Sequence, residues 1–182
     1  EVGAPYKVLL VGQRPDDALF LREALAPTAA TELVPSLFAC DVRRFDELPE
    51  LSLVDYAAVF LLDPPPLSSR SWNLLREFAE GGGGIGVFLG RNARSNEFNS
   101  DEAQQLLPAR LRWVSREATY LRPVASEHPA LVWLRELSDA PWPEFPVFQS
   151  WELEADAKAG DPAPASAAVV ATYANGKPAL VE

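Results

Sequence analysis

Short apolar runs recur through the first half of the chain, separated by amphipathic stretches. Apolar and β-branched residues dominate 6–12, which ends at a glycine, and 55–63, which leads into three prolines. A weaker run covers 32–38, and the run 85–89 follows four consecutive glycines. Runs of this length bounded by glycine or proline are typical of buried strands. We therefore predict a strand in each of these four segments.

Two helices are predicted between these strands. The segment 16–25 begins with two aspartates, which favour a helix start, and Pro27 follows its end. Ser68 or Ser69 can cap a second helix that ends at Glu80, just before the glycines. The apolar positions of the first helix form one stripe: Leu19, Phe20, Leu21, Ala24 and Leu25. Strands alternating with helices indicate an α/β fold with a flavodoxin-like, doubly wound parallel sheet and helices on both faces.

The second half of the chain is less regular and is rich in proline and aromatic residues. Two β-rich runs, 169–173 and 178–181, flank the pair Asn175-Gly176, and this pattern predicts a β-hairpin. At this length one domain can form a sizeable core, whereas two large domains cannot. We predict a single domain over residues 1–182, with an irregular, β-rich C-terminal part.

The net charge of −10 and the isoelectric point of about 4.6 argue against nucleic acid as a partner and against docking on anionic lipid. Cys40 is the only cysteine, and we predict a buried structural thiol. His128 is the only histidine, which excludes a site built from several histidines. We expect no metal and no cofactor.

No apolar stretch approaches the ~20 residues that a membrane-spanning helix needs. The sequence begins at Glu1, contains no methionine, and ends on residues that resemble the start of a further strand. We interpret it as a soluble segment of a larger protein whose other parts could hold membrane or catalytic elements.

Five residues at the end of the fourth predicted strand read Gly86-Val87-Phe88-Leu89-Gly90. This order resembles the strand end at which class I glutamine amidotransferases present their catalytic cysteine, with Phe88 in the cysteine's place. A phenylalanine has no nucleophilic atom, and His128 is followed by Pro129 and Ala130, without the His-x-Glu spacing that pairs a base with its orienting carboxylate. We therefore predict no catalytic residue, a tight strand-to-helix turn at Gly86 and Gly90, and Phe88 packed in the core beneath it.

Polar residues follow several of the predicted strands at their carboxyl ends, where ligands bind in open α/β sheets. Together with the phenylalanine they form a candidate vestigial pocket: Gln13, Arg14, Asp63, Phe88, Gly90, Arg91 and Asn92. Arg91, Asn92 and Arg94 could bind an anion there, or they could be solvated turn residues. The preceding glycines, 81–84, lie after a helix and before a strand, which indicates a helix-ending turn rather than a phosphate loop.

A broader resemblance rests on stretches spread over nearly the whole chain: 7–11, 19–25, 55–59, 74–78, 88–90, 106–111, 127–131 and 175–182. Together they resemble the class I glutamine amidotransferase-like domain of bacterial membrane proteins with an N-terminal double-transmembrane region of the Bat (aerotolerance) type. The resemblance implies a membrane-anchored protein acting with other domains or subunits of a membrane-associated complex. It implies no activity, because the cysteine is replaced, and it does not indicate the side of the membrane.

Three functions are therefore compatible with the sequence. The first is a non-catalytic module for protein interaction or ligand sensing. The second is a hydrolase that uses carboxylates such as Asp63 in the same crevice. The third is a carbohydrate-related protein similar to the trehalose-utilisation group, which resembles this fold and also lacks the cysteine.

Overall fold

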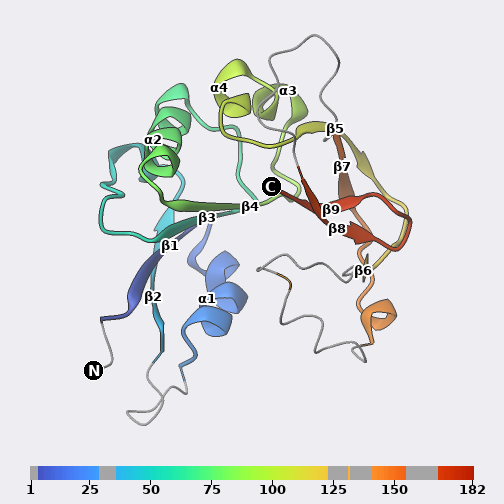
Figure 1. Cartoon of the computed structure of the whole chain (residues 1–182), viewed down its shortest axis with the longest axis horizontal. Coiled ribbons are helices and arrows are strands. Elements are labelled where there is room, and N and C mark those ends of the chain that lie inside the picture. The colour runs from blue at the N-terminus through green and yellow to red at the C-terminus, as the bar shows by residue number, and fades with distance from the viewer. Residues whose placement is uncertain (1–3, 29–35, 123–130, 132–140, 155–167) are drawn as a thin grey trace. The chain divides into compact units, whose positions relative to one another are not determined.

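A computed structural model describes residues 4–28, 36–122, 131, 141–154 and 168–182 (Figure 1). The chain forms two compact units, residues 1–97 and 98–182. Each unit has its own sheet structure, and the single domain predicted over residues 1–182 stays a prediction.

The first unit is built on a parallel sheet of four strands in the order β2-β1-β3-β4. The strands are β1 (Tyr6–Gly12), β2 (Phe38–Arg44), β3 (Ala58–Leu62) and β4 (Gly84–Phe88). Parallel strands need crossover connections, and helices supply two of them in this unit. The α/β class and the parallel sheet predicted from the sequence are thus confirmed.

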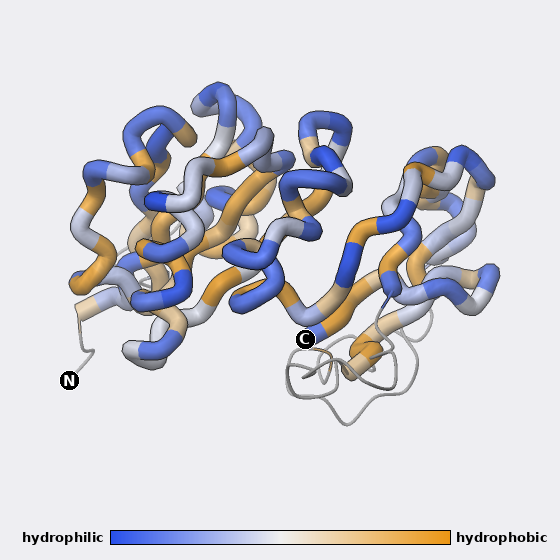
Figure 2. Tube along the Cα trace, turned by 90° about the horizontal axis from the view of Figure 1, so that it is seen from above, coloured by the Kyte–Doolittle hydropathy of each residue, from blue (hydrophilic) through white to orange (hydrophobic). Residues whose placement is uncertain are grey.

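Both faces of the two inner strands are buried, which explains why their sequences are continuously apolar. On one face Val8 and Leu10 pack with Leu21 and Leu25 of the helix α1 (Leu19–Leu25). The helix α2 (Ser69–Glu80) lies on the other side of the sheet in Figure 1. Figure 2 shows the hydrophobic strand segments inside this unit, with hydrophilic loops around them.

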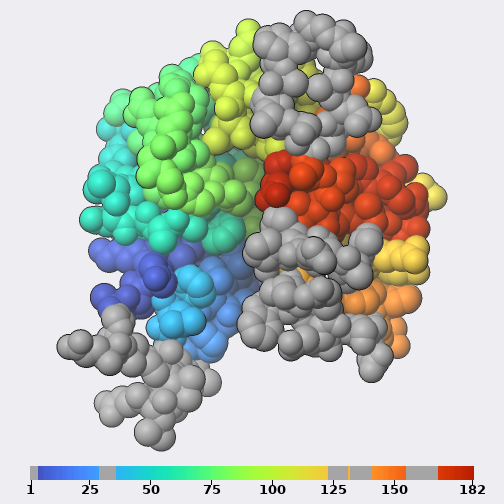
Figure 3. All heavy atoms as spheres, viewed as in Figure 1, coloured from blue at the N-terminus to red at the C-terminus, as the bar shows by residue number. Residues whose placement is uncertain are grey.

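The helix α2 begins and ends as its sequence predicts. The Ser68 hydroxyl accepts a hydrogen bond from the backbone N–H of Ser71 at 3.2 Å, which caps the helix. The glycines that follow Glu80 form the helix-ending turn, and Gly82 takes a φ of 93°. The helix α2 lies on the surface of the unit, as its green atoms show in Figure 3.

The helix α1 is shorter than predicted, because Pro15–Ala18 form a 3-10 helix before it. The second strand also lies later than predicted: β2 begins at Phe38, and the positions 32–35 fall outside the described residues. Phe38, Cys40 and Val42 pack on the core and the residues between them are exposed. This alternation is typical of an outer strand, and a continuous apolar run does not mark such a strand.

Cys40 lies inside β2 and is only partly buried, which corrects the prediction of a buried thiol. Its burial is still sufficient to raise the pKa of the thiol. The thiol is consequently protonated at neutral pH and is a poor nucleophile.

The second unit holds two small antiparallel sheets, consistent with the β-rich part that was predicted. The predicted hairpin is present: Asn175 and Gly176 connect its strands, and Gly176 takes a φ of 82°. One sheet pairs β5 (Arg110–Ser115) with β7 (Ser150–Glu154), and the other contains β6 (Leu121–Arg122), β8 (Val169–Tyr173) and β9 (Pro178–Val181). Two short helices, α3 (Ser95–Phe98) and α4 (Asp101–Gln104), precede these sheets in the chain. None of the helices in the described part of the chain is both long and apolar enough to span a bilayer.

Candidate functional site: a pocket at the strand ends of the first unit

An open pocket of about 830 Å³ lies at the carboxyl ends of β1, β3 and β4. All seven residues of the predicted pocket line it: Gln13, Arg14, Asp63, Phe88, Gly90, Arg91 and Asn92. The order of the strands reverses between β1 and β3, and this is where ligands bind in doubly wound sheets. The structure therefore brings the predicted residues together in one place.

Asp63 connects the end of β3 to the loop that follows β4. Its backbone N–H donates to the carbonyl of Phe88 at 2.9 Å. Its carboxylate accepts hydrogen bonds from the backbone N–H of Asn92 at 2.8 Å and from the Asn92 side-chain amide at 3.0 Å. Among the described residues Asp63 is the only non-glycine with a positive φ, 51°. This conformation turns its carboxylate to a loop residue far along the chain.

Glycine is required at two positions, one within β4 and one just after it. A Cβ at Gly90 would lie 2.4 Å from Cγ of Asp63, so only glycine lets the loop approach the carboxylate. A Cβ at Gly86 would lie 2.4 Å from Cδ1 of Phe60, whose ring occupies the space above the glycine. The centroid of that ring is 6.1 Å from the centroid of the Phe88 ring.

Phe88 itself corrects the sequence prediction. Its side chain is 52% exposed and lines the pocket, rather than packing in the core. The strand ends at Phe88 and α3 begins only at Ser95, so no tight strand-to-helix turn follows the strand. The physical reason is the position of α1, which packs over Val8 and Leu10 and leaves the end of β4, an outer strand, accessible.

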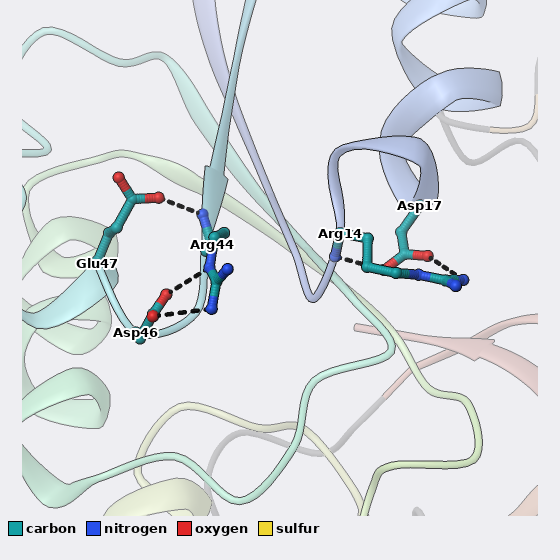
Figure 4. A network of polar contacts seen from close by, with 5 residues as sticks. All are labelled: Arg14, Asp17, Arg44, Asp46 and Glu47. Atoms are coloured by element: carbon teal, nitrogen blue, oxygen red, sulfur yellow. Dashed lines mark hydrogen bonds and ion pairs between the residues drawn. The ribbon is translucent and has the colours of Figure 1, made fainter.

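Arg14 and Asp17, which both line the pocket, form an ion pair with each other (Figure 4). The Asp17 carboxylate accepts from the backbone N–H of Arg14 at 2.9 Å and from its guanidinium at 3.3 Å. These hydrogen bonds, the backbone one foremost, lower the pKa of Asp17. Figure 4 shows the same kind of arrangement after β2, where Arg44 binds Asp46 and Glu47.

The three polar residues after β4 have different roles. Asn92 is held by Asp63, as described above. The Arg94 guanidinium donates to the carbonyls of residues 91, 92 and 93 at 2.9–3.2 Å, which fixes the loop from outside the pocket. Arg91 lines the pocket, and within the described ranges it forms no ion pair.

Six further lining residues were not predicted: Asp17, Phe20, Leu21, Ala24, Leu62 and Leu89. The most informative is Phe20, whose side chain is 86% exposed. The sequence contains a signal for the exposure of this side chain. Leu19, Phe20 and Leu21 are consecutive, and three adjacent positions of a helix cannot all face one core.

Other groups that could carry chemistry lie elsewhere or outside the described residues. His128 is at a position the structure does not describe. Ser95 carries the first side-chain hydroxyl after Gly90. It begins α3 and does not line the pocket. Across the described ranges, no group of three or more histidine, cysteine, aspartate or glutamate side chains is placed to hold a metal ion.

Comparisons with known proteins add no identification to this geometry. No family model matches the chain, and neither a curated protein nor a solved structure matches it.

Proposed function

We propose that this chain is a non-catalytic, amidotransferase-like module that binds a ligand or partner through the strand-end pocket, as part of a membrane-anchored assembly. One observation carries the proposal: the pocket gathers all seven predicted residues and exposes the Phe88 ring where a nucleophile would stand. An exposed ring favours binding, because it offers apolar surface and no reactive atom.

The strand order supports the flavodoxin-like part of this proposal. The strand order β2-β1-β3-β4 in the sheet matches the first four strands of the flavodoxin-like order 2-1-3-4-5. The amidotransferase-like comparison rests on Gly86, Phe88 and Gly90, which stand at the end of β4 in that sheet.

The hydrogen bonds of the pocket also favour a binding role. Asp17 is paired with Arg14, and both oxygens of Asp63 accept from Asn92. Carboxylates engaged in this way shape and fix the pocket wall. A general base, in contrast, must be able to reach a proton of the substrate.

A fragment screen by amide NMR tests the proposal. Ala24 is exposed on α1 and lines the pocket, so Ala24→Trp should fill it without disturbing the core. Arg22 is exposed on the same helix and does not line the pocket, which makes Arg22→Trp the matched control. We expect fragments to shift the amide signals of Asp63, Arg91 and Asn92 in the wild type and in Arg22→Trp, and not in Ala24→Trp. Equal responses in both variants, or no response at these amides, would overturn the proposal.

A carboxylate-dependent hydrolase is the alternative, because two carboxylates, Asp17 and Asp63, line one pocket. It predicts turnover of activated ester or glycoside substrates that Asp63→Asn abolishes. The binding proposal predicts no turnover by the wild type, and also no release of ammonia from glutamine.

A further inference from the structure

We propose that the ligand of the strand-end pocket is a flat aromatic molecule bearing a carboxylate group. This inference rests on the proposed function and specifies its ligand. It combines three properties of the pocket: its size, its exposed aromatic rings and its unpaired cation.

The size of the pocket suits a small organic molecule. Its volume of about 830 Å³ lies within the range of roughly 300–1,000 Å³ that is usual for small-molecule sites. It is shaped by α1 and by the ends of three strands, all within the first unit.

Two phenylalanine rings make the aromatic part of the site. Phe20 comes from α1 and Phe88 from β4, and their side chains are 86% and 52% exposed. Leu21 on α1 and Leu89, directly after β4, add apolar surface to the lining. A flat ring can contact such side chains in offset or edge-to-face geometry and remove both from water.

One cation of the pocket is available to an anion. Asp17 is paired with Arg14, while Asp63 keeps its negative charge and directs both carboxylate oxygens to Asn92. Arg91 remains as a cation without an ion pair in the described part of the chain. A guanidinium binds a carboxylate through two parallel hydrogen bonds, which gives both affinity and orientation.

The test compares three probes by NMR titration of the full chain. 1-Naphthoate carries ring and charge, 1-naphthamide carries the ring alone, and acetate carries the charge alone. We expect 1-naphthoate to bind about tenfold more tightly than 1-naphthamide, as one charge-assisted hydrogen-bond pair allows. We expect acetate to give no saturable shift. Raising the salt concentration should weaken only the binding of 1-naphthoate.

Three variants test which residues cause the preference for 1-naphthoate. Arg91→Gln should reduce the affinity for 1-naphthoate about tenfold, to that of 1-naphthamide. Arg43→Gln removes the same charge from β2, outside the pocket, and should leave both affinities unchanged. Phe20→Ala truncates an exposed side chain and should weaken both naphthyl probes equally. The amide spectrum of each variant verifies its fold.

The outcomes separate this inference from the proposed function. Equal binding of 1-naphthoate and 1-naphthamide in the pocket overturns the anionic ligand class and leaves the binding function in place. Binding of other fragments at Asp63 and Asn92, with neither naphthyl probe bound, overturns the aromatic class. No binding of any fragment at these amides overturns the proposed function as well.

Discussion

At the scale of single residues, the pocket depends on side chains whose environment differs from what their type suggests. Asp63 has a left-handed backbone conformation, and Phe20 and Phe88 are apolar residues that face water. The sequence places Asp63 and Phe88 at strand ends correctly. It does not reveal the hydrogen bonds that Asn92 donates to Asp63, because the partners are 29 positions apart and no local pattern relates them.

Phe88→Ala tests the exposure of this ring. Removing a half-exposed side chain should lower the free energy of unfolding by only about 1 kcal/mol. Phe45 is the matched control, because it is 8% exposed in the same unit, and Phe45→Ala should cost about 3 kcal/mol or more. Urea denaturation followed by circular dichroism measures both values. A loss in Phe88→Ala as large as in Phe45→Ala would place the ring in the core.

Asp63 should tolerate asparagine better than alanine. Asparagine adopts the left-handed conformation readily and keeps an oxygen for the Asn92 backbone N–H. Alanine loses both hydrogen bonds and is strained at this φ. We expect Asp63→Ala to lower the free energy of unfolding by about 2 kcal/mol, and Asp63→Asn by less than about 1 kcal/mol. Equal losses in urea denaturation would show that neither the conformation nor the amide contacts matter.

Asp17 should contribute to stability in a pH-dependent way. Its pKa is lower in the folded chain than its ordinary value of 3.8, so the ionised carboxylate stabilises the fold above that value. This contribution is lost as the pH falls through the lowered pKa. The stability difference between the wild type and Asp17→Asn should therefore be constant near neutral pH and shrink below about pH 4.

The backbone N–H of Arg14 is the main cause of this shift, so Arg14→Gln provides the control. It keeps that N–H and should preserve most of the pH dependence. Denaturation measured from pH 3 to pH 7 checks both variants, and the idea is refuted if Arg14→Gln removes the dependence completely.

At the scale of elements, local signals predicted β1, β3, α2 and the C-terminal hairpin. Each has its own stop or cap, such as Ser68 before α2 and Asn175-Gly176 in the hairpin. The position predicted for the second strand is wrong, because an outer strand alternates apolar and polar residues and shows no continuous apolar run. The exposure of Phe88 could not be predicted either, since it depends on where α1 packs on the sheet.

Close packing between β3 and β4 gives a prediction at this scale. A Cβ at Gly86 would collide with the Phe60 ring, whereas a Cβ at Gly84 would lie 3.5 Å from the Cβ of Ala58, an ordinary contact. Gly86→Ala should therefore destabilise the chain by about 1–3 kcal/mol. Gly84→Ala, on the same strand, should be close to neutral in the same denaturation experiment. The opposite ranking would contradict the packing of Phe60 over Gly86.

At the scale of the whole molecule, the residues that distinguish this chain converge in the first unit. The pocket combines strand-end positions that were predicted from the sequence with α1 side chains that were not predicted. The strand order explains why the strand-end positions meet, because parallel strands bring their carboxyl ends to one edge of the sheet. The consecutive apolar residues 19–21 indicate that one of them faces away from the core, but which of them lines the pocket depends on how the short helix packs on the sheet.

A crystal structure with the tightest-binding fragment tests the central claim most directly. We predict that the fragment lies at the carboxyl ends of β1, β3 and β4, in contact with Phe88 and Arg91, and that it is chemically unchanged. A fragment bound elsewhere, a pocket filled by the chain's own residues, or a fragment hydrolysed beside Asp63 would contradict the account.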